Sequence, residues 1–323
     1  MCTGSWIRGR SENRGNGCVL EFVLPAVREA MTTPTLLHTP LDRPGFHGFF
    51  GAWLIPGDPS LLVDTGPAEA GGRLIRDLDR MGIHRVDYVL ITHIHLDHAG
   101  GLARILERYP EARAVCHRKA VPHLAAPERL WAGSLEVLGE IAQAYGRPAP
   151  VPEDALIPHD EARIPGLVVL ETPGHAPHHL SFSYEGNLFA GEAAGNFLEL
   201  GEKEYLRPAT PPRFLLEEAL DSVDRLRALK DQRLCYAHFG RAPNSHPMLE
   251  RFREQLLRWR EILESVLRER PDAGPELCMD RLLERDPELA HFQLMDSTTQ
   301  RRERFFLENS VRGFVDYLRG GVE

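Results

Sequence analysis

The segment from residue 93 to residue 98 concentrates side chains of the kinds that bind metal ions. It holds His93, His95, Asp97 and His98, directly after an apolar run at residues 89–91. Because alternate residues of an extended or tightly turned segment face the same way, His93 and His95 can hold one ion while Asp97 and His98 turn toward a second. Imidazole and carboxylate ligands suit zinc or iron. The alternative is a chance cluster of solvated histidines, which the density of the motif disfavours.

Four further segments carry ligand-type residues upstream and downstream of this motif. They are residues 62–66 (Leu-Val-Asp-Thr-Gly), 172–175 (Thr-Pro-Gly-His), 189–192 (Phe-Ala-Gly-Glu) and 237–240 (Ala-His-Phe-Gly). Together with the His-x-His-x-Asp-His run, they resemble the metallo-β-lactamase-fold hydrolases in order and spacing over roughly residues 35–245. The run itself is the specific signal, and the shorter motifs add weight only through their order.

This resemblance implies a set of ligands and a reaction. The first metal would take His93, His95 and His175, the second would take Asp97, His98 and His238, and Glu192 would bridge them. Two divalent ions, zinc by preference with iron or manganese as alternatives, would lower the pKa of a shared water and so generate a hydroxide nucleophile. The implied activity is hydrolysis of a small ester, thioester or lactone, in the style of glyoxalase II and the lactonases. Asp97 is the expected proton carrier to the leaving group.

Glu192 departs from the family pattern, which usually has an aspartate at this position. The additional methylene lengthens the side chain by about 1.5 Å, the length of one carbon–carbon bond. Glu192 would therefore bridge both ions, bind only one of them, or be a surface acid after a strand. Three alternatives to the hydrolase consequently stay open: a single-iron sulfur-dioxygenase-like oxidoreductase, a phosphodiesterase, and a metal-binding protein without turnover.

Composition disfavours several other classes of protein. The chain has 323 residues and a formal net charge of −9, and it lacks a polybasic run, so nucleic acid is a poor candidate partner. No apolar stretch approaches the roughly 18 residues of a membrane span, so no membrane association is expected. The cysteines lack C-x-x-C spacing, which favours a reduced, cytoplasmic location over a disulfide framework. They are Cys2, Cys18, Cys116, Cys235 and Cys278.

Three regions are expected along the chain. Residues 1–30 combine Gly, Ser, Asn and Arg, and we interpret them as a poorly ordered extension that lacks the pattern of a signal peptide. Residues 31–246 are expected to form the metallo-β-lactamase-fold domain. Residues 247–323 are expected to form a helical appendage that covers the mouth of the active site, forms a homodimer or completes the core.

Apolar periodicity predicts the elements that position the motifs. Strands are expected at residues 48–55, 60–64, 86–92, 114–117, 167–171, 180–184, 188–190 and 233–236. Helices are expected at residues 70–81, 102–109, 134–145, 215–229, 249–267 and 297–318, the last with Asp296 as its N-cap. Two β-rich halves with helices outside predict an α/β fold, a four-layer αβ/βα sandwich with a C-terminal helical appendage.

The residues after Glu192 give a hint of substrate binding. Residues 196–212 are expected to form a rigid, proline-stiffened loop over the metals, or a plain connection between strand and helix. On this loop, Tyr205 and Arg207 are candidate anchors for a polar or anionic group of a small-molecule substrate.

Other residues of chemical interest receive supporting roles. Asp64 is expected to support the metal loop, since an aspartic protease would need a second Asp-Thr-Gly triplet, which the chain lacks. Either His178 or His179 is expected to support a ligand. His117 and His159 lack ligand spacing and are expected to be surface or internally satisfied residues.

Overall fold

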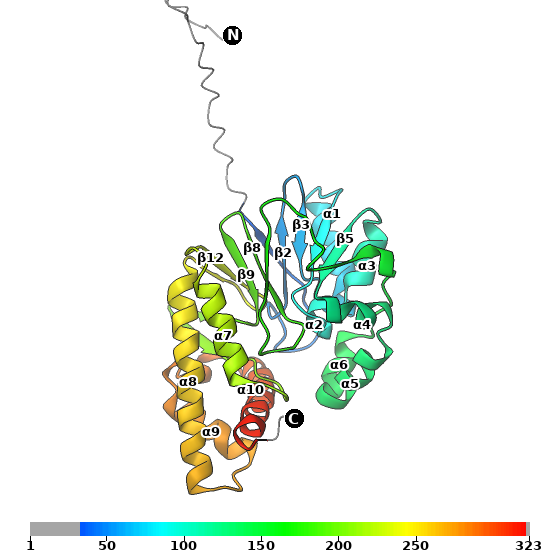
Figure 1. Cartoon of the computed structure of the whole chain (residues 1–323). Coiled ribbons are helices and arrows are strands. Elements are labelled where there is room, and N and C mark those ends of the chain that lie inside the picture. Colours follow the sequence, from blue (N-terminus) through cyan, green and yellow to red (C-terminus); the bar gives the residue numbers. More distant parts are fainter. Residues whose placement is uncertain (1–32, 321–323) are drawn as a thin grey trace, which may run out of the picture. The chain divides into compact units, whose positions relative to one another are not determined.

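The computed structural model describes residues 33–320 (Figure 1), so the extension expected at residues 1–30 lies outside the described residues. The strands are β1 (Thr35–His38), β2 (Gly51–Ile55), β3 (Leu61–Val63), β4 (Tyr88–Leu90), β5 (Arg113–Cys116), β6 (Leu156–Pro158), β7 (Val168–Glu171), β8 (Leu180–Tyr184), β9 (Asn187–Gly191), β10 (Asn196–Leu200), β11 (Lys203–Arg207), β12 (Arg233–Tyr236) and β13 (Arg241–Ala242). The helices are α1 (Gly71–Arg80), α2 (Leu96–Ala99), α3 (Leu102–Arg108), α4 (Val121–Ala125), α5 (Glu128–Leu138), α6 (Glu140–Tyr145), α7 (Leu216–Arg227), α8 (Ser245–Glu269), α9 (Pro275–Arg285) and α10 (Ser297–Leu318).

Two large sheets contain all of these strands except β10 and β11, which pair with each other. The first sheet has the order β1-β2-β3-β4-β5-β6, in which β1, β2 and β3 are antiparallel neighbours and β3 to β6 run parallel. The second sheet has the order β13-β12-β9-β8-β7, and β9 and β12 are its parallel pair. Strands β4, β9 and β12 therefore direct the segments that follow them to the same edge of the molecule.

Alternating side chains build a core on each face of each sheet. In β4, Val89 packs toward α1 and α3 outside the first sheet, whereas its neighbour Leu90 packs between the sheets. In β9, Leu188 faces α7 and α8 outside the second sheet, and Phe189 lies between the sheets. This period-two division produces the predicted four layers, which Figure 1 shows as helices on either side of the paired sheets.

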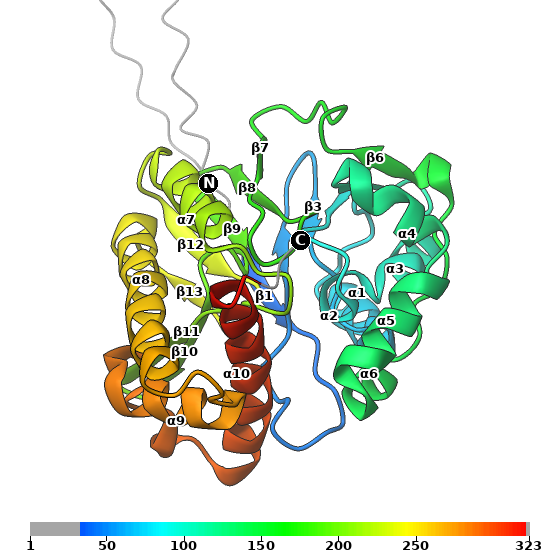
Figure 2. The ribbon, with the colours of Figure 1, turned by 60° about the horizontal axis from the view of Figure 1, so that its bottom comes forward.

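The C-terminal helices share a core with the second sheet. Helices α8, α9 and α10 pack against one another (Figure 2), and Trp259 and Phe314 belong to the same apolar cluster as Leu234 of β12. Within residues 33–320, no helix is both long enough and apolar enough to span a membrane.

Several element predictions were wrong in detail. Strand β1 was missed, because its four residues have no clear alternation, yet it pairs with β2 along its whole length. The helix expected at residues 134–145 is two helices, α5 and α6, separated by Gly139 with a positive φ of 55°. The rigid loop expected after Glu192 contains a β-hairpin, β10–β11, in which Asn196 pairs with Arg207. Helix α9 was also missed.

Candidate metal centre

The ligand-type residues lie where parallel strands end. His93 and His95 occupy the short segment between β4 and α2, and Asp97 and His98 lie in α2 itself. His175 follows β7, Glu192 directly follows β9, and His238 follows β12. The structure therefore brings together every residue predicted as a ligand, although their positions span almost 150 residues of the chain.

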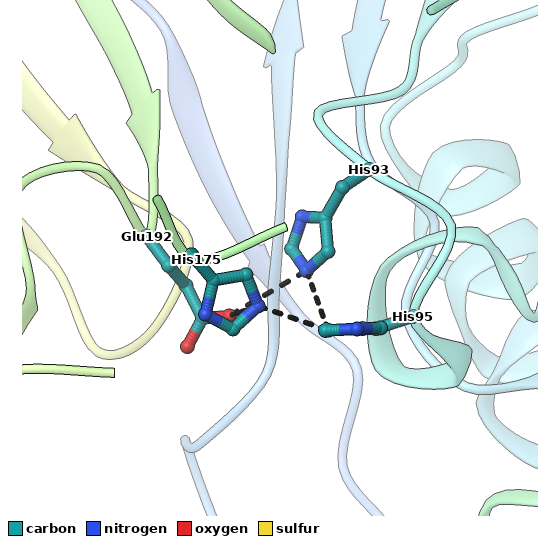
Figure 3. Close-up of side chains that lie close together, drawn as sticks. All are labelled: His93, His95, His175 and Glu192. Carbon is teal, nitrogen blue, oxygen red and sulfur yellow. Dashed lines mark hydrogen bonds and ion pairs between the residues drawn. The ribbon is translucent and has the colours of Figure 1, made fainter. Parts of the chain in front are cut away.

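The first group consists of His93, His95, His175 and Glu192, which Figure 3 shows turned toward one another. His95 Nδ1 lies 3.1 Å from His93 Nε2 and 2.9 Å from His175 Nε2. Glu192 Oε2 lies 2.7 Å from His175 Nε2 and 3.5 Å from His93 Nε2. Three ring nitrogens and a carboxylate oxygen thus converge on one small volume, which is the arrangement that a metal ion requires.

The second group consists of Asp97, His98 and His238. Asp97 Oδ2 lies 3.7 Å from the Nε2 atoms of both His98 and His238. Glu192 connects the two groups, because its Oε2 lies 2.7 Å from His175 Nε2 in the first group and 3.8 Å from His98 Nε2 in the second, while its Oε1 lies 3.5 Å from His238 Nε2. The carboxylate of Glu192 therefore lies between the two groups.

Hydrogen bonds at the far ring nitrogens fix the orientation of these histidines. The Nδ1 acceptors are Asp64 Oδ2 for His98 at 2.9 Å, the Ala209 carbonyl for His175 at 2.9 Å, and the Phe49 carbonyl for His238 at 3.0 Å. Carbonyl and carboxylate oxygens only accept, so each Nδ1 carries the proton and each Nε2 directs a lone pair into its group. His98 Nε2 is buried and has no hydrogen-bond partner within residues 33–320. A buried donor or acceptor without a partner is costly, so this nitrogen fits a metal ligand.

The electrostatics also favour a cation. Burial, helped by neighbouring imidazoles, lowers the pKa of His93 well below its ordinary value, so this ring stays neutral and keeps a lone pair. Burial would also lower the pKa of His98, but the carboxylates of Asp97, Asp64 and Glu192 together raise it to about 9. The position that His98 faces is therefore one where positive charge is stabilised.

Buried residues outside the ligand groups hold the loops in place. Asp64 has a positive φ of 57°, and its Oδ1 accepts the backbone N–H of Thr92 at 2.8 Å. His179 Nε2 accepts the backbone N–H of Glu192 at 3.0 Å, so His179 has the supporting position that the sequence assigned to one of two histidines. Gly191 has a positive φ of 58°, and a Cβ there would lie 2.4 Å from His179 Nε2. The backbone before Glu192 consequently requires glycine.

The proposed substrate anchors are buried, and this corrects the interpretation of their segment. Tyr205 and Arg207 lie in β11 and are 1% and 2% exposed. Arg207 Nε donates to Glu303 Oε2 of α10 at 2.5 Å, and the ring of Tyr205 packs toward Phe292. Because Arg207 is paired with Glu303, it is not placed to bind a substrate, whereas substrate anchoring by Tyr205 stays a prediction.

A third cluster of potential ligands has a different explanation. His117, His159 and Glu171 lie close enough to hold an ion. However, the Nδ1 atoms of both histidines accept backbone N–H groups, from Lys119 at 3.0 Å and Arg118 at 3.2 Å. Each Nε2 therefore carries the proton and faces Glu171, at 3.7 Å from His117 and 2.9 Å from His159. As expected for residues without ligand spacing, these histidines are satisfied within the protein.

Sequence reasoning missed several neighbours of the metal centre. The ring of Phe49 stacks on His238 with centroids 4.3 Å apart. Asn196 Nδ2 donates to Glu192 Oε1 at 3.2 Å. Tyr145 of α6 lies beside Phe50, with ring centroids 5.2 Å apart. No local motif marks these residues, because their proximity arises from segments far apart in the chain.

Comparison with known proteins agrees with this geometry. The model of the metallo-beta-lactamase superfamily matches residues 52–238, a range that includes every candidate ligand. The chain belongs to this superfamily.

Individual relatives are distant. A metallo-beta-lactamase fold-containing protein, ST1585, of Sulfurisphaera tokodaii is 28% identical over 212 residues, which are 63% of this chain and 76% of that protein. A hydroxyacylglutathione hydrolase of Nitrobacter hamburgensis is 29% identical over 188 residues, which are 58% of this chain and 60% of that protein. The crystal structure of ST1585 superposes with a TM-score of 0.64 at 20% identity and covers 87% of this chain and 98% of that chain, which supports the fold.

Proposed function

We propose that this protein is a metal-dependent hydrolase that cleaves a small ester, thioester or lactone. The observation that carries the proposal is the position of Glu192, whose carboxylate lies between two groups of ligand-type side chains. A carboxylate in this position is suited to bridge two ions. The similarity to a protein named hydroxyacylglutathione hydrolase supports an acyl substrate.

The proposal includes two divalent ions. Zinc is preferred, because histidine nitrogens dominate both groups, while iron or manganese would also accept these ligands. The first ion would be held by His93, His95 and His175, and the second by Asp97, His98 and His238, with Glu192 between them. When bound, such ions supply a water of lowered pKa and a Lewis acid for the substrate oxygen.

Protein side chains then have two tasks in the reaction. The ligand histidines must be correctly oriented, which their Nδ1 hydrogen bonds ensure. Asp97 is the half-buried member of the second group, and its carboxylate is our candidate to carry a proton from the attacking water to the leaving group. The expected partner is a small molecule.

A cytoplasmic location remains part of the proposal. Cys116, Cys235 and Cys278 are buried free thiols, as expected in a reducing compartment.

The test combines metal analysis with a substrate panel. Protein loaded with zinc, manganese or iron is assayed with esters, thioesters, lactones and phosphodiesters, and oxygen uptake is recorded to detect a sulfur dioxygenase. His93→Ala and His238→Ala are compared for metal content, with His117→Ala as a control for loss of a buried histidine outside the centre. We expect two ions per wild-type chain, fewer in the first two variants, and no change in the control. Two ions in His238→Ala would show that the second site is assigned wrongly, and tight metal binding without turnover would refute the hydrolase.

A further inference from the structure

Tyr145 has a buried hydroxyl group for which the described part of the chain provides no hydrogen-bond partner. The residue ends α6, and its side chain is 1% exposed. A hydroxyl that loses water on folding and gains no partner destabilises the folded state. Such a group therefore requires an explanation, and a ligand that supplies the missing partner is one.

The surroundings of Tyr145 belong to the metal centre. Helix α6 packs against α2, the short helix that carries Asp97 and His98. The ring of Tyr145 lies edge-on to Phe50, whose own ring centroid is 6.1 Å from that of His238. Tyr145 therefore belongs to a helix that contacts α2, and its ring packs on Phe50, a neighbour of His238.

Two carboxylates of the metal centre are among the charged groups that act on the phenol oxygen of Tyr145. The carboxylates that act electrostatically on the phenol oxygen are those of Asp97 and Glu192, and the opposing cations are Arg302 and Arg207. The phenol oxygen of Tyr145 and His98 Nε2 are both shielded from solvent, and neither has a hydrogen-bond partner within residues 33–320. Both atoms are polar groups that the protein has left available to something bound in the centre.

We propose that Tyr145 donates a hydrogen bond to the substrate oxygen that becomes negatively charged during hydrolysis. This inference rests on the proposed function. When the water oxygen forms a bond to the carbonyl carbon, the electron pair of the carbonyl double bond moves to the carbonyl oxygen. Tyr145 keeps its proton throughout, since a phenol is protonated at neutral pH, and its O–H dipole stabilises the new charge. Tyr145 would thus be a catalytic residue contributed by a helix outside the segments that carry the ligands.

A matched pair of variants tests this role. Tyr145→Phe removes only the hydroxyl and keeps the ring that packs on Phe50. Tyr236→Phe is the control, because Tyr236 is also a buried phenol with an unpartnered hydroxyl, but the charged groups acting on its oxygen are Arg251, Glu204 and Glu288, outside the metal centre. Both variants are compared with wild-type protein for metal content, melting temperature, ester hydrolysis and binding of a phosphonate monoester, a tetrahedral anionic analogue of the intermediate.

In zinc-loaded Tyr145→Phe, we expect kcat to fall by about 100-fold or more with little change in KM, the effect seen when one oxyanion donor is removed. The melting temperature should equal or exceed that of the wild type, because no protein hydrogen bond is lost. The metal content should be unchanged, and the phosphonate should bind about tenfold more weakly. Tyr236→Phe should match the wild type in turnover and in phosphonate binding.

Several results would overturn the inference. One is that Tyr145→Phe keeps the turnover and the phosphonate binding of the wild type. Another is a marked fall in the melting temperature or the metal content of Tyr145→Phe. A third is that Tyr236→Phe loses as much turnover and phosphonate binding as Tyr145→Phe does. A loss that grows with the pKa of the leaving group would also overturn it, because that pattern indicates proton delivery rather than stabilisation of the oxyanion. If the wild type hydrolyses no ester, the proposed function fails, and phosphonate binding by the two variants still decides whether Tyr145 contacts an anion in the centre.

Discussion

Asp64 and His98 are joined by a buried hydrogen bond of 2.9 Å between Oδ2 and Nδ1, across 34 positions of the chain. The same carboxylate accepts the backbone N–H of Thr92 at 2.8 Å, directly before the first ligand, His93. One side chain at the end of β3 therefore orients a ligand ring and anchors the start of the ligand loop. This relationship assigns Asp64 a precise mechanical task although it is not among the candidate ligands.

Asp64→Asn is expected to weaken metal binding by about 10–100-fold, the usual consequence of losing the carboxylate that orients a ligand histidine. Asparagine tolerates the positive φ of 57° at this position, so the backbone should be retained. Competition with a chromophoric chelator measures the affinity. Asp87→Asn is the control, because Asp87 Oδ2 accepts the backbone N–H of Ser60 at 2.8 Å away from the centre. Wild-type affinity in Asp64→Asn would contradict the orienting role.

Glu192→Asp is expected to weaken binding of one of the two ions. The shorter side chain withdraws the carboxylate by about 1.5 Å. In the wild type the carboxylate oxygens of Glu192 lie 2.7 Å from His175 Nε2 and 3.5 Å from His238 Nε2, so a carboxylate that is withdrawn cannot keep both distances. Titration with zinc, followed by calorimetry, should show two similar events in the wild type and one weakened event in the variant. Glu199→Asp on the neighbouring strand β10 controls for general effects. Two unweakened events would show that the length of Glu192 does not determine the spacing of the sites.

Much of the fold follows from local pattern. The buried strands of the two sheets and the helices at residues 71–80, 102–108 and 216–227 were predicted within a few residues, because each has clear apolar periodicity and a turn signal at its end. Strand β1 was missed for the opposite reason. The four residues of β1 acquire their strand conformation from pairing with β2, which is a non-local interaction.

The candidate site likewise has residues that the sequence predicts and residues that it does not. Its ligands were predictable because imidazoles and carboxylates are chemically distinctive and follow the strands in a recognisable order. The groups that orient these ligands were mostly not predictable. His175 donates to the backbone carbonyl of Ala209 and His238 to that of Phe49, and a backbone carbonyl is supplied by any residue type. The interior position of Arg207 was also missed, since its partner Glu303 is 96 residues away.

Glu303→Gln is expected to lower the free energy of unfolding at pH 7 by about 3–5 kcal/mol, the usual cost of leaving a buried ion pair incomplete. Glu303 is fully buried and accepts from both Arg207 and Arg302, so the variant would leave two guanidinium groups without a countercharge. Urea unfolding of both proteins gives the difference. Glu308→Gln is the control, because the exposed pair of Glu308 with Arg312 is worth only about 0.5 kcal/mol.

The ion pairs of Glu303 also predict how the difference in free energy of unfolding between wild type and Glu303→Gln depends on pH. Burial alone would raise the pKa of Glu303, but Arg207 and Arg302 lower it below the ordinary value of 4.5. Below that value the unfolded chain binds the proton that the folded protein does not, so the contribution of Glu303 is complete above pH 4.5 and is lost as pH falls through the lowered pKa. The difference between wild type and Glu303→Gln should therefore shrink in acid. A difference that is constant, or that grows toward low pH, would contradict this account.

Asp296→Ala is expected to destabilise the protein by about 1 kcal/mol through loss of the N-cap of α10. The sequence predicted this cap, and the structure confirms it, since the carboxylate accepts the backbone N–H groups of Thr298 at 2.9 Å and Thr299 at 3.1 Å. Asp296→Asn keeps an acceptor at the same position and should retain most of the stability.

Hydrogen bonds from Thr298 and Thr299 lower the pKa of Asp296 below its ordinary value of 3.8, so the charged form caps the helix above that pH and its advantage disappears in stronger acid. Urea unfolding at neutral pH should rank the proteins as wild type, Asp296→Asn, then Asp296→Ala. Because α10 also carries Phe306, whose ring stacks on Phe49 beside His238, metal content should be measured in parallel. The metal content should stay unchanged, because the cap lies at the first turn of α10 and Phe306 lies more than two turns further along the helix. Equal stability of the alanine and asparagine variants would show that the side chain of Asp296 does not cap the helix.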